Sequence, residues 1–358
     1  MSEILIFSKT NWDEVPRLRH QTANLLKRFN RSIYFFQKPS FPWCSREPSK
    51  PVKIADNFHI ARTEQLIHHQ LRLTKSLMAI NSYFEKIAIK SVVKSFSQNP
   101  IIINFNYDYF FLREIFPGSK IITILNDDFV AQARFFDGKP ILKALEKTCS
   151  ISDDVLVVSY PIFNQVKNFC NPVLFLPWSD TGYKNPSPQN KRFKTLLWAH
   201  IDGRIDFELI SAAAKKMPDV VFDLVGPVSN NVSARLEKIC TENSNIIYSP
   251  PRDLNDIDFD TYFCSIIPYK CGIADIEAVT ISNKTFQLLA RGMPIATHGM
   301  PNFYDHPAII KSNTLESFVS GLTSLREKFV DLQIDIEKLI LINGPDSRLK
   351  FLSNLLFQ

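Results

Sequence analysis

A short stretch near the C-terminus carries the residues with the clearest chemistry. Ser282, Asn283 and Lys284 stand at the start of an expected helix over 285–290, and Gln287 follows Lys284 three residues later on the same helix face. The free N–H groups and the dipole of a helix start already favour anions, so a cation and an amide there suit a phosphorylated ligand. The simpler interpretation is a surface helix in which Lys284 and Gln287 are solvated.

A pair of carboxylates, Asp127 and Asp128, follows the apolar run Ile121–Leu125 and is therefore expected at a strand end. One carboxylate can act as a general base toward a hydroxyl group. Two adjacent carboxylates rarely point the same way, so we take Asp127 as the base, with Asp128 and Asp13 as alternatives. The competing interpretation makes the pair an N-cap for a helix beginning at Phe129.

Length and composition indicate a soluble protein of two domains. The chain has 358 residues, of which 45% are hydrophobic and 22% are charged. It has no run of about 18 apolar residues and no hydrophobic leader near Met1, so we expect a cytoplasmic protein. The six cysteines show no zinc spacing and are expected to be reduced thiols.

The net positive charge of the chain is concentrated in its first half. Residues 1–180 hold 23 Lys and Arg against 16 Asp and Glu, a net of +7, whereas residues 181–358 hold 19 against 20, a net of −1. A basic half favours an anionic partner, such as a membrane surface or a lipid diphosphate. Without Arg-rich blocks or nucleic-acid-binding motifs, we expect no nucleic-acid partner.

Short apolar runs alternate with amphipathic stretches along the whole chain, which predicts an α/β protein with parallel sheets. The expected strands are 4–7, 32–36, 101–105, 120–125, 155–158, 195–199, 220–225, 246–248, 265–269 and 294–297. The expected helices are 18–29, 66–96, 141–148, 162–169, 207–216, 232–241, 285–290 and 346–358.

A polar stretch over 180–192 predicts a linker between two such domains. We therefore expect a first domain over 1–180, a second over 181–345 and a C-terminal helix over 346–358. Two open α/β domains place a ligand cleft between them, at the C-terminal ends of their strands.

Several segments, in this order and spacing, resemble bacterial polysaccharide glycosyltransferases of the GT-B fold. These segments are the loop–helix–strand stretch 280–297, the loop 198–207 after a strand, the strand ending 222–227, the segment 245–252, the strand 258–269, the loop 11–20, the "D-D" segment 124–129 and the strand 155–160. The resemblance implies two Rossmann-like open parallel-sheet domains facing each other across a cleft. The first would bind the acceptor and the second a nucleotide sugar, and the terminal helix would cross back to the first domain.

One departure from that family bears on the mechanism. Retaining members commonly carry two Glu residues in the diphosphate loop, whereas Val279 and Gln287 occupy these positions here. The Ser282–Gln287 pattern is more similar to the xanthan glucuronosyltransferase and its inverting relatives, where Lys and Gln bind the diphosphate and an Asp of the first domain is the base. That resemblance implies an inverting enzyme without metal or other cofactor, and a UDP-linked donor such as UDP-glucuronic acid.

The resemblance also assigns further binding residues. Arg204 would neutralise the diphosphate beside Lys284, Tyr269 would lie near the ribose, and Arg252 would lie near the base through its backbone. A core position is the alternative for Tyr269. The loop after the first strand would bind the acceptor, through Trp12, Asp13, Arg17 and His20.

The implied acceptor is a polysaccharide or a glycan on a lipid carrier, in capsule or exopolysaccharide biosynthesis. The basic stretch 66–96 could hold the protein peripherally on the inner face of an anionic membrane. It could equally be a solvated helix covering a core. Two further alternatives are a retaining transferase and a non-catalytic nucleotide- or sugar-binding protein.

Overall fold

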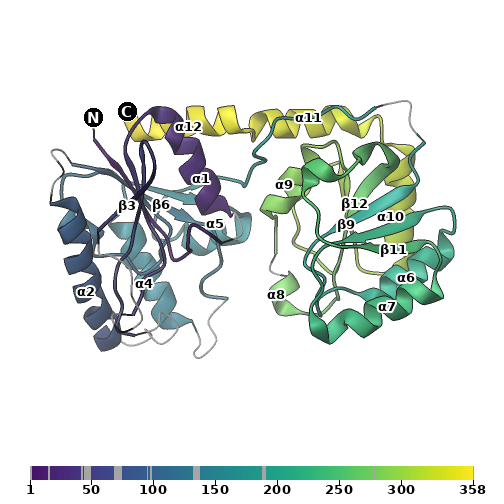
Figure 1. Ribbon diagram of the computed structural model, residues 1–358, viewed down its shortest axis with the longest axis horizontal. Helices are drawn as coiled ribbons and strands as arrows, with labels where there is room; N and C mark the ends of the chain where they lie inside the picture. Colours follow the sequence, from purple (N-terminus) through teal and green to yellow (C-terminus); the bar gives the residue numbers. More distant parts are fainter. Residues whose placement is uncertain are drawn as a thin grey trace. The chain divides into compact units, whose positions relative to one another are not determined.

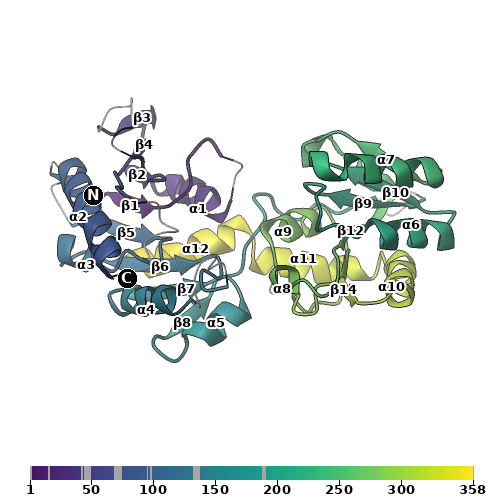
Figure 2. The same ribbon diagram turned by 90° about the horizontal axis from the view of Figure 1, so that it is seen from below.

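The chain folds into two compact α/β units, as a computed structural model shows (Figure 1). Unit 1 comprises Met1–Leu176 and Leu349–Gln358, and unit 2 comprises Pro177–Arg348. Helices lie on both sides of each sheet (Figure 2). The structure describes residues 2–14, 17–41, 43, 50–67, 75–94, 96, 99–131, 138–187, 191–277 and 279–357.

The sheet of unit 1 has the strand order β3-β4-β2-β1-β5-β6-β7-β8. All its pairs are parallel except β3 with β4, an antiparallel edge that the sequence did not predict. The strands are β1 (Ile4–Phe7), β2 (Ile33–Phe36), β3 (Val52–Ala55), β4 (Phe58–Ala61), β5 (Ile101–Asn104), β6 (Ile121–Leu125), β7 (Asp154–Val157) and β8 (Pro172–Leu174). The fully buried β1, β5 and β6 are the apolar runs expected of central parallel strands.

The described helices of unit 1 cover this sheet. They are α1 (Leu18–Leu26) with the 3₁₀ turn η1 (Lys27–Phe29), α2 (Lys75–Val93), α3 (Leu112–Ile115), α4 (Lys139–Ser150) and α5 (Tyr160–Val166). On one face of the sheet, Ile89 and Val92 of α2 join a buried cluster with Leu5 and Phe7 of β1.

The predicted helix 66–96 is corrected at its start. Leu66 and Ile67 lie outside α2, because their backbone N–H groups donate to Oδ1 of Asn81, at 3.0 Å each. Asn81 in turn donates to the carbonyl of Ile67. Residues 68–74 of the predicted helix lie outside the described residues. The segment before α2 is thus held by a buried amide rather than by helical bonds.

The sheet of unit 2 is parallel throughout its described pairs, in the order β11-β10-β9-β12-β13-β14. Its strands are β9 (Lys194–Trp198), β10 (Val221–Val225), β11 (Ile246–Ser249), β12 (Tyr262–Pro268), β13 (Ile295–His298) and β14 (Ile309–Ser312). Its helices are α6 (Phe207–Lys216), α7 (Ser233–Glu242), α8 (Ala274–Glu277), α9 (Asn283–Leu289), α10 (Leu315–Glu327) and α11 (Leu332–Ile342). Short 3₁₀ turns lie at Asn230–Val232, Leu254–Asp256 and Phe259–Thr261. The sequence predicted neither β14 nor α8, α10 and α11.

The polar stretch predicted as a linker packs on unit 2 where it is described. The backbone N–H of Lys184 donates to the carbonyl of Ala290 at 2.7 Å, and Arg192 donates to the carbonyls of Phe259 and Tyr262 at 2.9 and 2.7 Å. The chain passes from unit 1 to unit 2 at Leu176, a few residues before that stretch.

The C-terminal helix α12 (Pro345–Phe357) ends in unit 1. Its Phe351 ring stacks on Phe175 with centroids 5.4 Å apart, and Phe357 meets Phe29 edge to face at 5.1 Å. Aromatic packing of this kind attaches the end of the chain to the unit with which the chain begins.

Candidate functional site

In unit 2, the loops that follow β9 and β12 form one connected polar surface. These strands are parallel neighbours, so both loops leave the same edge of the sheet. The N–H of Asp206 donates to the carbonyl of Pro268 at 2.8 Å, and that of Lys270 donates to the carbonyl of Arg204 at 3.0 Å. The ammonium of Lys270 also donates to the carbonyl of Gly203 at 2.7 Å. The loop around Arg204 is therefore held by the end of β12.

Lys284, in the first turn of α9, lies within electrostatic reach of this loop. Burial is the main cause that lowers the pKa of its ammonium from 10.5 to about 8, and the positive charge of Arg204 lowers it further. Asp202 acts in the opposite sense. Within the described part of the chain, the ammonium has no hydrogen-bond or ion-pair partner. A desolvated cation beside a second cation favours an anionic ligand.

Arg204 is held in place by its neighbours but keeps free donors. Its Nε lies 3.0 Å and its Nη2 2.7 Å from the two carboxylate oxygens of Asp202. The guanidinium lies over the ring of Tyr269, 5.5 Å from the centroid, and burial raises the pKa of the Tyr269 phenol. The Nη1 amine of Arg204 has no partner in the described residues and can donate to a ligand. Tyr269 thus lies at the predicted site, under the guanidinium.

The other three residues of the Ser282–Gln287 pattern are engaged in different ways. The Ser282 hydroxyl accepts from the N–H of Thr285 at 3.3 Å and caps α9, which spans seven residues. The side-chain oxygen of Asn283 is buried without a partner in the described residues. Gln287 donates from Nε2 to Asp180 at 3.0 Å. In this structure Ser282 and Gln287 are thus occupied by protein groups, whereas Asn283 and Lys284 each present an unmatched polar atom.

Arg252 lies in the segment after β11, the strand beside β10 in the sheet of unit 2. Its carbonyl, the backbone group expected near a nucleobase, accepts from the indole N–H of Trp198 at 2.9 Å. Its guanidinium approaches the buried Asp223 at 3.8 Å. Gly226, which directly follows β10, has a φ of +150°. A Cβ there would lie 1.8 Å from the carbonyl oxygen of Ala199. The loops after β9 and β10 are therefore packed backbone to backbone.

In unit 1, the two adjacent carboxylates after β6 have different surroundings. Asp128 accepts from the N–H groups of Val130 and Ala131 at 3.1 and 2.9 Å, so it caps the turn that begins at Phe129. Asp127 instead accepts from Asn126 at 2.5 Å and from Arg19 at 3.3 Å. The capping interpretation therefore describes Asp128. Asp127 keeps 39% of its side chain exposed, and its role as the base stays a prediction.

Sequence reasoning missed three charged residues at this edge of unit 1. Arg19 of α1 is buried, which lowers its pKa, and it joins Asp127 to Thr10. Lys9, just after β1, lies 2.6 Å from both oxygens of the buried Asp108, which follows β5. The sequence signal was present, because Lys9 and Asp108 follow strands as Asp127 does. Their pairing depends on the strand order, which a single sequence does not give.

The predicted acceptor loop is partly a structural element. Trp12 packs on Phe58, Phe35 and His20, with ring centroids 4.5, 5.1 and 5.3 Å away. His20 is buried and accepts from the N–H of Arg17 at 3.0 Å. Its other ring nitrogen lies 3.0 Å from the carbonyl of Asn11. His20 therefore shapes the loop rather than facing a ligand. The side chains of Asp13 and Arg17 are exposed, and their role in acceptor binding stays a prediction.

The described residues form neither a metal cluster nor a membrane-spanning helix. Among the described residues, no group of three or more His, Cys, Asp or Glu side chains could hold a metal ion. Nor does any described helix combine the length and apolarity needed to cross a bilayer. The five cysteines that the structure describes are unbridged; Cys44 lies outside them.

Comparison with solved structures decides the fold. No family model and no curated protein sequence matches the chain. A sucrose-phosphate synthase of Thermosynechococcus elongatus superimposes with a TM-score of 0.66 over 100% of this chain and 99% of its own, at 12% identity. The lipopolysaccharide outer core galactosyltransferase WaaB gives 0.64 at 12% identity, with 99% of both chains covered. This chain has the GT-B fold.

A further structure with the same fold is Anabaena HepE in complex with UDP, with a TM-score of 0.64, 10% identity and 99% of both chains covered. The superposition over the whole length of these chains establishes the fold. The prediction of two Rossmann-like domains is confirmed. The closer resemblance to the xanthan glucuronosyltransferase stays a prediction.

Proposed function

We propose that this chain is a glycosyltransferase that moves a sugar from a nucleotide-sugar donor to a polysaccharide or a lipid-linked glycan. Unit 2 would bind the donor and unit 1 the acceptor. We take the donor to be UDP-linked, with glucuronic acid as the sugar that the sequence resemblance suggests. The GT-B fold supports a glycosyltransferase in general, and the residues of the candidate site support the details.

The observation that carries the proposal is the environment of Lys284. A partly buried ammonium without a partner in the described residues lies beside Arg204, whose Nη1 is also free. Two cations in this arrangement repel each other until an anion joins them. A diphosphate would supply negative charge to neutralise the two cations, and oxygen atoms to accept their hydrogen bonds. A nucleoside diphosphate is also the group that a nucleotide sugar releases on transfer.

In the proposed reaction, an acceptor hydroxyl attacks the anomeric carbon as the bond from that carbon to the diphosphate oxygen breaks. The hydroxyl proton passes to the carboxylate of Asp127. The electron pair of the broken bond stays on the nucleoside diphosphate, where Lys284 and Arg204 stabilise the negative charge. Attack opposite to the leaving group inverts the anomeric carbon. The step requires no metal or other cofactor, because side-chain cations replace it at the leaving group.

A retaining reaction is the second candidate, and two hydrogen bonds to Asp127 favour it. Arg19 and Asn126 both hydrogen-bond to Asp127, and both stabilise its ionised form. A carboxylate stabilised in this way is a weaker base. The retaining alternative needs no base in unit 1, since the departing diphosphate can take the proton of the incoming hydroxyl.

A thermal-shift screen with nucleotides and nucleotide sugars tests the donor site. A ligand that binds only the folded chain raises its melting temperature. We expect UDP and a UDP-sugar to raise it, and uridine to have little effect because it lacks the diphosphate. No shift with any nucleoside diphosphate would refute the proposal. Product stereochemistry by NMR then separates inversion from retention, and binding without turnover would indicate a non-catalytic binding protein.

A further inference from the structure

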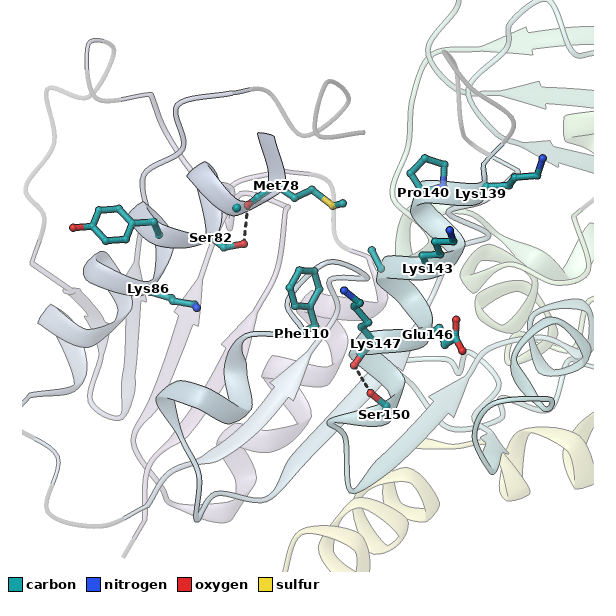
Figure 3. A pocket seen from close by; sticks show the side chains of 13 residues that line it. Met78, Ser82, Lys86, Phe110, Lys139, Pro140, Lys143, Glu146, Lys147 and Ser150 are labelled. Atoms are coloured by element: carbon teal, nitrogen blue, oxygen red, sulfur yellow. Dashed lines mark hydrogen bonds between the residues drawn. The ribbon is translucent and has the colours of Figure 1, made fainter. Parts of the chain in front are cut away.

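A groove in unit 1 shares no residue with the predicted donor site of unit 2 and has a distinct chemistry. It encloses about 990 Å³ between α2 and α4 (Figure 3). We call it the α2–α4 groove and define it by Met78, Tyr83, Lys86, Phe110, Lys143 and Lys147. Apolar and aromatic groups come from α2 and from the segment after β5, whereas α4 contributes lysines along its length.

The outer face of α2 is apolar although it is exposed. Ile80, Tyr83 and Ile87 keep 42%, 62% and 50% of their surface exposed. Their spacing of three and four residues places them on one helix face. The opposite face of α2 is buried, because Ile89 and Val92 pack into the core of unit 1. Exposed apolar residues gathered on one face mark a surface that binds something apolar.

The lysines of α4 form a row beside this apolar face. Lys139, Lys143 and Lys147 stand four residues apart, so they project from one side of the helix. Like charges at this spacing weaken a helix. Lys143 has no acidic partner in the described residues, and Lys147 lies over the ring of Phe110, 5.4 Å from its centroid. One acidic side chain, Glu146, also lines the groove.

We propose that the α2–α4 groove and the adjoining face of α2 dock on a bilayer of anionic phospholipids. Ile80, Tyr83 and Ile87 would enter the boundary between headgroups and acyl chains, while the lysines of α4 bind the phosphates. Charge complementarity supports this occupant, since α2 and α4 together contain six Lys and two Glu, and one of these, Glu85, is buried. Apolar residues bordered by lysines are the composition of helices that lie in a membrane interface.

The apolar surface extends beyond the groove, which favours a bilayer over a single bound lipid. Met78, Tyr83 and Phe110 give the groove an apolar lining, which a single isoprenoid or acyl chain would cover. Ile80 and Ile87 lie outside that lining, on the exposed helix face, and a bilayer would cover them as well. The proposal does not depend on sugar transfer, so its test is independent of the test of the donor site.

Co-sedimentation of the full chain with vesicles tests the docking. One vesicle type is phosphatidylcholine alone, and the other contains equal parts of phosphatidylcholine and phosphatidylglycerol. We expect stronger binding to the anionic type, and weaker binding at about 1 M salt, where the Debye length falls to about 3 Å. Each lysine near an anionic surface contributes about fivefold in affinity, so Lys143→Ala with Lys147→Ala should lower the partition coefficient about 25-fold.

Two further variants complete the design. Ile80→Ser, Tyr83→Ser and Ile87→Ser together should lower the binding that persists at high salt, because that part is apolar. The matched control is Lys215→Ala with Lys238→Ala, two exposed lysines of unit 2, which should bind like the wild type. Unchanged melting temperatures show that each variant is folded, since all the substituted side chains are exposed.

Three outcomes would overturn the docking proposal. The first is a folded wild-type chain that pellets with neither vesicle. The second is a control variant that loses as much binding as the groove variant. The third combines two results: the wild type does not bind vesicles, and farnesyl diphosphate raises its melting temperature. In this outcome the double variant Lys143→Ala with Lys147→Ala shows no such rise. That third result would assign the groove to a single isoprenoid diphosphate.

Discussion

Replacing Lys284 by Met should make the free protein more stable while it weakens nucleotide binding. Methionine has a similar length and no charge, so it can occupy the same space without the cost of burying an ammonium. Structural lysines behave in the opposite way, since their loss removes an ion pair and lowers stability. The direction of the stability change therefore distinguishes a ligand-binding lysine from a structural one.

The magnitude follows from the lowered pKa. A fall from 10.5 to about 8 corresponds to roughly 3 kcal/mol, at about 1.4 kcal/mol for each pH unit. The side chain is only partly buried, so solvent reduces this figure, and we expect a gain of about 1–2 kcal/mol. Because the folded state binds this proton less tightly than the unfolded state, the penalty is complete below pH 8. It disappears as the pH rises toward 10.5, so the advantage of Lys284→Met should vanish there.

Urea unfolding of wild type and Lys284→Met at pH 7 and pH 10 measures the gain and its pH dependence. Calorimetric titration with UDP measures the loss of binding, which we expect to be about 1.5–3 kcal/mol, as for a hydrogen bond to a charged group. Lys215→Met, an exposed lysine of α6, serves as the control and should change neither quantity. A Lys284→Met protein that is less stable at pH 7 and binds UDP as the wild type does would refute the reasoning.

Three other predictions concern the proposed base, the dependence on metal and the packing of the loops in unit 2. Asp127→Asn should lower the transfer rate about 10²–10⁴-fold with donor binding nearly unchanged. Asp128→Asn should mainly loosen the turn at Phe129 and lower the melting temperature. If Asp127→Asn keeps full activity while Asp128→Asn or Asp13→Asn is inactive, the base is the residue whose variant is inactive. Transfer should persist in EDTA, and a complete loss that magnesium or manganese restores would contradict metal-independent catalysis. Gly226→Ala should lower the free energy of unfolding in urea by about 3 kcal/mol, because the new Cβ would meet the Ala199 carbonyl. Gly203→Ala is the control and should be nearly neutral, because the space around Gly203 is open. Equal effects of the two substitutions would be evidence against the close packing of these loops.

The central strands were predictable, whereas the sheet edge and the last helices were not. The runs that became β1, β5 and β6 are almost wholly apolar, and burial on both faces of a parallel sheet demands this. β3 is exposed along its whole length and pairs antiparallel, so no burial pattern marks it. α10 did carry a usable signal, the capping box of Thr314 and Ser317, which the sequence analysis did not use.

The predicted donor residues lie close together in the sequence or follow a strand, which is why a single sequence could suggest them. Arg204 lies in the loop after β9, and Lys284 lies in the first turn of α9, the second helix after the neighbouring parallel strand β12. Gln287 fits the motif equally well, yet Asp180, more than 100 residues away, accepts from its amide. Arg19 could not be predicted to contact Asp127, because that pair depends on how α1 packs on the sheet. Local patterns thus identified the loops, and tertiary packing decided which side chains stay free.

Transfer of a sugar from a nucleotide sugar releases the nucleoside diphosphate, so the release of that product measures the proposed reaction directly. The wild-type chain is incubated in EDTA with UDP-sugars and isoprenoid-diphosphate-linked glycans, and UDP is quantified over time. We predict that UDP forms with the wild type and that Lys284→Ala lowers its rate of formation at least tenfold. No UDP from any donor–acceptor pair, from a folded chain that binds UDP, would contradict the account and indicate a binding protein.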